Sequence, residues 1–157
     1  MYKHSANHPI NIQADKMVVK PQKQYVEFQG NVRVKQDEML LIADTLLVHM
    51  NSSKKGSSIT RESVEKINAN GNVNITWNNY RVEADTAVYV APENKLVISG
   101  DKATLYQGKN TIAGAIITLY MNTDQIEIES KKGEQIEAIY EFTDNEIQSL
   151  KKTGKKQ

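Results

Sequence analysis

Residues 25–34 read Tyr25-Val-Glu-Phe-Gln-Gly-Asn-Val-Arg-Val34, and this stretch decides the fold class of the chain. Apolar and polar side chains alternate on both sides of the glycine, and a period of two residues is typical of a β-strand with one buried face. The same alternation recurs at residues 72–77, 81–84 and 125–129. The sequence therefore predicts an all-β protein built from many short antiparallel strands.

Two short signatures alternate along the chain. One is Ala-Asp before an apolar run, and the other is a glycine between two runs. Their centres are Asp15, Gly30, Asp44, Gly71, Asp85 and Gly100. Neighbouring centres lie 14 or 15 residues apart, except where an insertion near residues 51–62 widens one step, and Ala113-Gly114 continues the series in degenerate form. A repeat of this kind predicts stacked two-strand units, with the glycines in turns and the aspartates capping turns.

Counting by two from these signatures sorts the side chains onto two faces of the predicted sheet. Positions two and four from each signature are almost all apolar and predict one continuous inner wall. This wall comprises Met17, Val19, Val26, Phe28, Val32, Val34, Leu46, Val48, Ala69, Val73, Ile75, Ala87, Tyr89, Leu96, Ile98, Ile116 and Thr118. The opposite parity is polar, as at Glu27, Arg33 and Lys35, and suits a face in water.

Composition narrows the function classes. Twenty Lys and Arg oppose nineteen Asp and Glu in 157 residues, so a net charge of +1 provides no field to attract nucleic acid. Cysteine is absent, and no apolar run is long enough to span a membrane. The start of the chain lacks the apolar segment of a signal peptide, which leaves either a cytoplasmic protein or a mature sequence whose signal peptide was removed.

The domain organisation follows from the same pattern. We expect a disordered N-terminal segment at residues 1–8, one domain over residues 9–142, and a polar, basic tail over residues 143–157.

No catalytic, metal or cofactor site is predicted. The repeated aspartates invite a metal or carboxylate-pair hypothesis, but no histidine partner or Asp-x-Asp cluster accompanies them. The three histidines, His4, His8 and His49, are scattered and are expected to face solvent or to pair locally. Basic residues of the N-terminal half are interpreted as a solvated face, with contact to phosphate groups as the alternative.

Several segments share their order and spacing with a known family. They include Pro9-Ile-Asn-Ile-Gln-Ala-Asp15, Phe28-Gln-Gly-Asn-Val-Arg-Val34, Leu41-Ile-Ala-Asp-Thr-Leu-Leu-Val48 and Gly133-Glu-Gln-Ile-Glu-Ala-Ile139. Over roughly residues 8–142 the chain resembles the OstA-like (LptA) family of periplasmic lipopolysaccharide-transport proteins. It departs from the pattern at Gly114, where the repeat has Asp.

This resemblance implies a twisted, open β-jelly roll whose interior takes the acyl chains of lipid A, with no enzymatic activity. It implies periplasmic residence, which requires that a signal peptide was removed. It also implies head-to-tail assembly through edge strands near Ile10–Ile12 and Ile136–Tyr140. The implied partners are lipopolysaccharide, an inner-membrane anchor of the same fold and the outer-membrane lipopolysaccharide translocon.

The candidate lipid-binding residues come from the resemblance and from parity. Ile10 and Ile12 match family positions near one open end of the groove, and Tyr89 matches an interior aromatic position. The full candidate set is Ile10, Ile12, Phe28, Val32, Val34, Leu46, Val48, Ile75, Tyr89, Leu96 and Ile98. Ordinary core packing is the alternative for each of them. Trp77 and Tyr106 end apolar runs and are interpreted as lids on a core or gates at a rim.

The predicted function is to hold lipid A acyl chains and to bridge the inner and outer membranes during lipopolysaccharide export. Alternatives within the family are a membrane-anchored relative and the periplasmic domain of the translocon. Two alternatives have other functions. Strand repeats would also occur in a structural β-scaffold that binds no lipid and in a polysaccharide-active β-helix enzyme.

Overall fold

The computed structural model describes residues 9–51 and 63–141, and these residues form one antiparallel sheet. The strands are β1 (Asn11–Gln13), β2 (Lys16–Lys20), β3 (Tyr25–Gln36), β4 (Met39–Met50), β5 (Val64–Trp77), β6 (Tyr80–Val90), β7 (Lys95–Gln107), β8 (Asn110–Tyr120), β9 (Gln125–Glu129) and β10 (Glu137–Ile139). A short 3-10 helix, η1 (Pro21–Lys23), links β2 to β3. The predicted all-β class is confirmed. The expectations for residues 1–8 and 143–157 lie outside the described residues.

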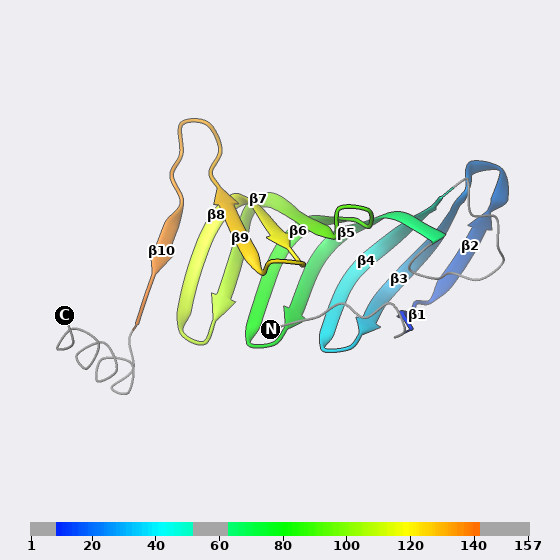
Figure 1. The fold of residues 1–157 in the computed structure, drawn as a ribbon, viewed down its shortest axis with the longest axis horizontal. Coiled ribbons are helices and arrows are strands. Elements are labelled where there is room, and N and C mark those ends of the chain that lie inside the picture. The colour runs from blue at the N-terminus through cyan, green and yellow to red at the C-terminus, as the bar shows by residue number, and fades with distance from the viewer. Residues whose placement is uncertain (1–8, 52–62, 142–157) are drawn as a thin grey trace.

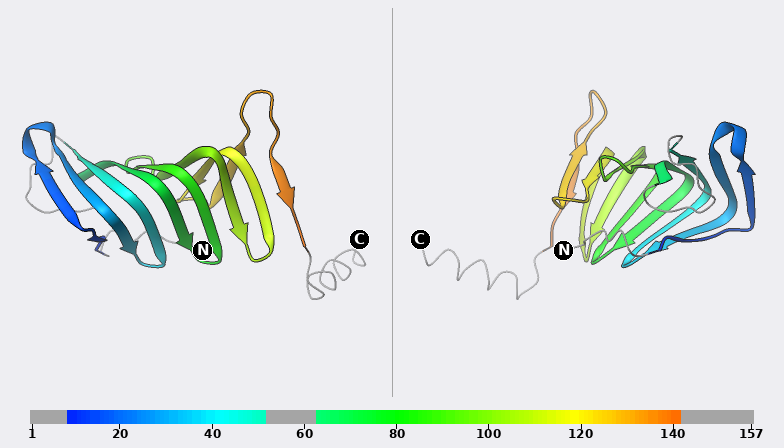
Figure 2. Two further views of the ribbon diagram at one scale, coloured as in Figure 1. Left: turned by 180° about the vertical axis from the view of Figure 1, so that it is seen from behind. Right: turned by 45° about the vertical axis from the view of Figure 1, so that its right-hand side comes forward.

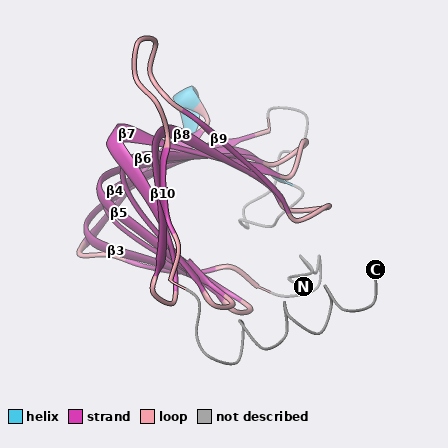
Figure 3. Ribbon diagram, turned by 90° about the vertical axis from the view of Figure 1, so that its left-hand side faces the viewer, coloured by secondary structure: helices cyan, strands magenta, loops and turns pink. Residues whose placement is uncertain are grey.

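The strands follow one another across the sheet in the order β1-β3-β4-β5-β6-β7-β8-β10, with β2 beside β3 and β9 beside β8 (Figure 1). Seen end-on, the sheet curls into an open C and forms a trough (Figure 3). The largest fully buried side chains face the inside of this trough; they include Leu46, Ile75, Ile98, Ile117 and Leu119. The core therefore lies between the two arms of one curled sheet.

The prediction that the signature glycines lie in turns is wrong. Gly30 lies inside β3 and Gly71 lies inside β5, where the backbone adopts φ values of +82° and +84°. The pairing register shifts at both places, between Gln29 and Val32 and between Asn70 and Val73. Each glycine therefore belongs to a β-bulge, which bends a long strand and increases its twist without ending it. Short predicted runs are joined in this way into long strands.

The signature aspartates support these bulges and do not cap turns. Asp44 in β4 lies against Gly71, and its Oδ2 accepts a hydrogen bond of 2.8 Å from the side-chain amide of Asn72. Asp15 has the same contact with Gly30 and accepts a 2.8 Å bond from Asn31. A β-carbon on the glycine would collide with the carboxylate, so the pair requires glycine.

The third signature aspartate also contacts its glycine, but it accepts its hydrogen bond from a backbone N–H group. Asp85 lies against Gly100, and its Oδ2 accepts a 3.1 Å hydrogen bond from the backbone N–H of Asp101.

The turns between strands lie at other positions than the signature glycines. Two-residue turns at residues 37–38, 78–79 and 108–109 begin with Asp37, Asn78 and Gly108, all at positive φ. Positive φ at this position is typical of tight β-hairpins.

Most of the predicted inner wall is buried and Tyr89 is half-buried, but three positions are exceptions. Met17 and Val19 are 58% and 54% exposed, although they pair with the inward Phe28 and Val26 and so share their face. They are exposed because β2 is at the end of the sheet, where the trough is open.

Ile116, the third exception, points outward because the repeat was placed one residue too early in β8. Gly114 pairs with the buried Ala103, so Gly114-Ala115 is the true equivalent of Ala-Asp. A shift of one residue exchanges the two faces of a strand, so Ile117 and Leu119 take the inner positions and Ile116 is 37% exposed.

The bulge contacts predict a difference between two Gly-to-Ala substitutions. Gly71→Ala would place a β-carbon 2.9 Å from the β-carbon of Asp44, whereas Gly108→Ala meets no atom within 4 Å. Both glycines have positive φ, so both substitutions carry the left-handed backbone cost. We expect urea unfolding to show a loss of roughly 2–4 kcal/mol for Gly71→Ala and roughly 1–2 kcal/mol for Gly108→Ala. Equal losses would contradict a steric role for Asp44.

Candidate functional site

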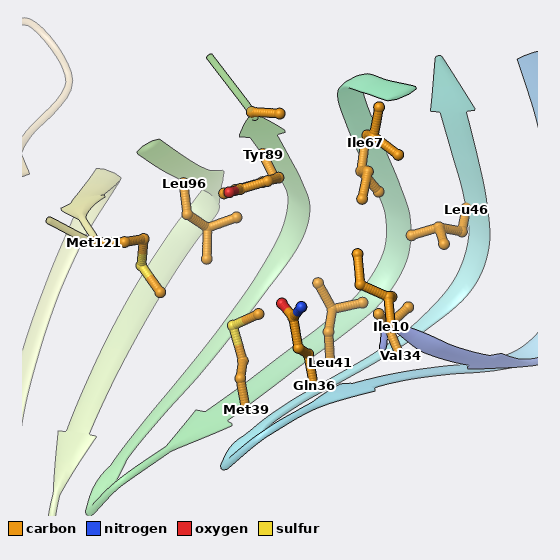
Figure 4. Close-up of a pocket in the computed structure, with 12 residues that line it drawn as sticks. Ile10, Val34, Gln36, Met39, Leu41, Leu46, Ile67, Tyr89, Leu96 and Met121 are labelled. Atoms are coloured by element: carbon orange, nitrogen blue, oxygen red, sulfur yellow. The ribbon is translucent and has the colours of Figure 1, made fainter. Parts of the chain in front are cut away.

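An apolar pocket lies inside the trough, near the middle of the sheet. Residues from many strands contribute to it, and Figure 4 shows their side chains converging on one space. The lining comprises Ile10, Val34, Gln36, Met39, Leu41, Leu46, Val64, Ile67, Tyr89, Ala91, Leu96 and Met121. Gln36 and Tyr89 are the polar members of this set. A lining of this composition fits hydrocarbon and offers no charged group.

The curl of the sheet creates the pocket. Met39 and Leu41 follow the β3–β4 turn at one long edge of the sheet, whereas Ala91 and Met121 follow β6 and β8 at the opposite long edge. In a flat sheet these two edges would be separated by the full length of the strands. Because the sheet curls, their side chains line the same space.

A chain of hydrogen bonds holds one wall of the pocket. The Tyr89 hydroxyl donates to the Asn94 Oδ1 over 2.8 Å, and the Asn94 side-chain amide donates to the Asn122 Oδ1 over 2.6 Å. Asn94 is 4% exposed and has a φ of +48°, which Asn tolerates in a turn. These bonds connect the β6–β7 turn to the β8–β9 turn and fix the Tyr89 ring at the pocket wall.

The cavity volume of the pocket is about 50 Å³. Pockets for small molecules usually have volumes of roughly 300–1,000 Å³. A long hydrocarbon chain therefore fits only if the two arms of the trough separate or if it also occupies the open ends. The inner face continues to both ends, where Met17 and Val19 at one end and Ile126 and Ile128 at the other extend it.

The structure divides the predicted lipid-binding residues into two groups. Those that line the pocket are Ile10, Val34, Leu46, Tyr89 and Leu96. Those that lie in the core beside it are Phe28, Val32, Val48, Ile75 and Ile98, all of them buried, and Ile12, which packs against the core. Both groups belong to the inner side of the trough. Contact of either group with an acyl chain remains a prediction.

Sequence reasoning missed several lining residues, namely Gln36, Met39, Leu41, Val64, Ile67, Ala91 and Met121. The signal for Leu41 was present, because Leu41 and Ala43 alternate in the same way as Leu46 and Val48. The register shift opposite the Gly71 bulge changes parity between these two pairs, so counting in both directions from Ala43 would have found Leu41. Most of the others lie near strand ends, where the position of the turn decides their direction.

The described charged residues and His49 lie outside the pocket lining. Lys16, Arg33 and Lys35 are exposed, as expected for a solvated face. His49 is half-buried, with its ring 6.0 Å from that of Tyr25. Burial lowers the pKa of His49 below its usual value, and the nearby Lys66 adds to this effect. His4 and His8 lie outside the described residues.

Trp77 and Tyr106, which were predicted as lids or gates at strand ends, lie in different surroundings. Trp77 is buried and stacks on Tyr80, with ring centroids 5.1 Å apart. Tyr106 lies under the guanidinium of Arg81, which is 4.0 Å from the ring centroid. Tyr106 is not among the residues that line the apolar pocket.

Within residues 9–51 and 63–141, no group of three or more His, Cys, Asp or Glu side chains is arranged to hold a metal ion. The same residues include no helix long and apolar enough to cross a membrane. The fold and the pocket together define a class of protein: an open antiparallel β-trough with an apolar interior.

Comparison with known proteins identifies the family within this class. The family model described as "LptA/(LptD N-terminal domain) LPS transport protein" matches residues 11–125, so the chain belongs to this family of lipopolysaccharide-transport proteins. The resemblance to the OstA-like (LptA) family is thereby confirmed.

Two individual proteins are similar to the chain. The crystal structure of LptH from Pseudomonas aeruginosa, described as the LptA homologous periplasmic component of the conserved lipopolysaccharide transport device, has a TM-score of 0.72 and 18% identity. The match covers 87% of this chain and 98% of LptH, and it shows the shared fold. Protein R00383 of Rhizobium meliloti, an uncharacterized protein, is 24% identical over 131 residues, which are 82% of this chain and 69% of R00383.

The hydrogen bonds at the pocket wall predict the effect of Tyr89→Phe. This change removes the donor to a buried Asn94 oxygen but keeps the apolar ring, so we expect a loss of about 1–2 kcal/mol in the free energy of unfolding. Tyr106→Phe, on the ring beneath Arg81, is the control and should change stability by less than about 0.5 kcal/mol. Thermal unfolding monitored by circular dichroism measures both. Similar effects in the two variants would contradict this role of the Tyr89 hydroxyl.

Proposed function

We propose that the trough carries the acyl chains of lipopolysaccharide and bridges the inner and outer membranes during export. The observation that supports this proposal is the apolar pocket, lined from both long edges of the sheet, in a member of a lipopolysaccharide-transport family. The residues in the pocket lining are those that we propose to contact hydrocarbon. The core residues beside them become accessible to a chain only when the arms separate.

Binding hydrocarbon needs no catalyst. Removing a CH₂ group from water contributes about 0.8 kcal/mol, so even a short segment of an acyl chain offsets some rearrangement of the wall. The same figure makes release of several chains into water slow. Transfer from one trough directly into another avoids that release, because the hydrocarbon stays covered throughout.

Both ends of the trough have features that suit such a transfer. Strands β2 and β9 are each five residues long, and each pairs with one neighbour among the described residues. Their inner side chains are apolar, with Met17 and Val19 in β2 and Ile126 and Ile128 in β9. An unpaired strand edge offers backbone donors and acceptors to another chain. We propose that copies stack head to tail through these ends, with β1 and β10 beside them.

The outward side chains of the two ends have opposite charge. Lys16 and Lys20 lie on β2, and Glu127 and Glu129 lie on β9. Opposite charges steer one end toward the other, and like charges oppose the pairing of two identical ends. The charge pattern therefore favours a stack with one direction.

The proposed partners at the two ends of a stack are proteins with the same fold. We propose an inner-membrane anchor at one end and the outer-membrane translocon at the other. The family description joins LptA with the N-terminal domain of LptD, so proteins other than LptA share this family's domain. We place the chain in the periplasm because it belongs to this family and because its structural relative LptH is described as a periplasmic component.

A structural scaffold that binds no lipid is the second candidate. The small cavity volume of about 50 Å³ favours it, because a trough packed against itself needs no ligand. The scaffold and the carrier share their stacking surfaces and differ in lipid uptake.

Lipid uptake is tested with Met39→Glu, which adds a carboxylate to the pocket lining at a half-buried position. Ile116→Glu adds the same group to the outer face and is the control. After mixing with purified lipopolysaccharide, native mass spectrometry with lipid extraction should show at least tenfold less bound lipid for Met39→Glu, because hydrocarbon beside a charge is unfavourable. Ile116→Glu should bind as the unaltered chain does.

Circular dichroism must show the same sheet content in both variants. If the unaltered chain takes up no lipopolysaccharide yet still assembles, the carrier function is wrong and the scaffold replaces it. If both variants lose lipid equally, the pocket is not the binding site.

Stacking is tested by exchanging charges between the two ends. Replacing Lys16 and Lys20 with Glu should reduce the average oligomer size in analytical ultracentrifugation, because both ends are then acidic. Replacing Glu127 and Glu129 with Lys in that same variant should restore larger assemblies, and high salt should weaken the charge effect. Assemblies unaffected by either exchange would exclude contact between β2 and β9.

A further inference from the structure

A second cleft lies between two turns that belong to opposite long edges of the sheet. One side is the β5–β6 turn with Trp77, Asn79 and Tyr80, and the other is the β8–β9 turn with Asp124 and Gln125. Its volume is about 340 Å³, which is within the range of small-molecule pockets. The curl of the sheet, visible in Figures 2 and 3, brings these edges to face each other.

This cleft adjoins the apolar pocket. Met121, which follows β8, lines both spaces. The Tyr89–Asn94–Asn122 hydrogen bonds fix the position of the turn to which Met121 belongs. A ligand with a hydrocarbon chain in the pocket therefore has the cleft within reach of its other end.

The composition of the cleft differs from that of the pocket. Trp77 and Tyr80 form a stacked pair with ring planes 23° apart, in which Trp77 is buried and the half-buried Tyr80 presents the more accessible ring. Around this pair are the side-chain amides of Asn78, Asn79 and Gln125 and the carboxylate of Asp124, and the described lining includes no Lys or Arg. Aromatic rings pack against the C–H groups of a sugar ring, and amides and carboxylates pair with its hydroxyl groups. A phosphate would instead require cationic groups, which this lining lacks.

We propose that the cleft binds a neutral sugar ring of a glycolipid whose acyl chain occupies the apolar pocket. This inference rests on the proposed function and adds a recognition site for the head of the lipid. The pocket selects for hydrocarbon, and the cleft selects for hydroxyl groups close to the point where the hydrocarbon begins.

The polar residues of the cleft have a second possible reason to be there. Asn78 and Asp124 have φ values of +52° and +58°, a conformation that Asn and Asp tolerate better than most residues. If the turn alone explains them, glycine can replace both without effect on a ligand, because glycine adopts the same conformation. Substitution by glycine therefore separates a turn role from a binding role.

The test uses the full chain and three probes that share an octyl chain, each below its micelle concentration. Octyl β-D-glucoside carries a sugar, pentaethylene glycol monooctyl ether carries an uncharged head without sugar hydroxyls beyond its terminal one, and octyl phosphate carries an anion. Titration calorimetry gives the affinities. Emission of Trp77, the one tryptophan of the chain, reports occupation of the cleft.

We expect octyl glucoside to bind most tightly and to shift the Trp77 emission. The double variant Asn78→Gly with Asp124→Gly should weaken octyl glucoside by about three- to tenfold, as expected for lost hydrogen bonds, and leave the octyl ether unchanged. Gln24→Gly is the control, since Gln24 has a φ of +57° and lies far along the chain, after η1. It should alter neither affinity.

The other outcomes separate the two proposals. Equal binding of all three probes, unaffected by the glycine variants, would leave the acyl-chain pocket standing and overturn the sugar site. Tightest binding of octyl phosphate would also overturn it, in favour of an anion site. No binding of any probe would overturn both the sugar site and the acyl-chain function.

Discussion

The contact between an aspartate on one strand and a glycine bulge on the next is the constraint on which the trough depends. At Asp44 and Gly71 the chain accepts a left-handed backbone and a hydrogen bond from Asn72 in the middle of two paired strands. A bulge bends its strand and increases its twist. Because similar contacts recur along the sheet, the bends accumulate in one direction, and the sheet curls around its apolar face.

The bulge also resolves a conflict of periodicity. Ala43 and Leu46 are three residues apart and both are buried, although a regular strand would place them on opposite faces. The register shift between Ile42 and Thr45, which faces the extra residue of the β5 bulge, accommodates this change of parity. As a result, a long strand keeps an apolar inner side along both of its halves, and the two halves can form the opposite arms of one trough.

A sheet that curls without closing has properties that a closed barrel lacks. It retains two ends whose edge strands stay available for pairing, and its inner face continues to those ends at residues such as Met17 and Ile128. The same inner face serves as core and as pocket lining, so stability and ligand capacity depend on the same side chains. The cavity is small because the apolar side chains of the two arms pack against each other.

The all-β class, the repeat and most of the inner wall could be predicted from the sequence, because a period of two residues records burial directly. The family could be recognised as well, since the order and spacing of its segments survive in the linear chain. The positions of the turns could not be predicted, because Gly-Asn is compatible with both a hairpin turn and a bulge, and only pairing across the sheet distinguishes them. The tertiary structure likewise decided which buried residues line the pocket, because Met39 and Met121 meet only when opposite edges of the sheet curl together. Local pattern determines which face of a strand is apolar, whereas the curvature accumulated over many strands determines what that face encloses.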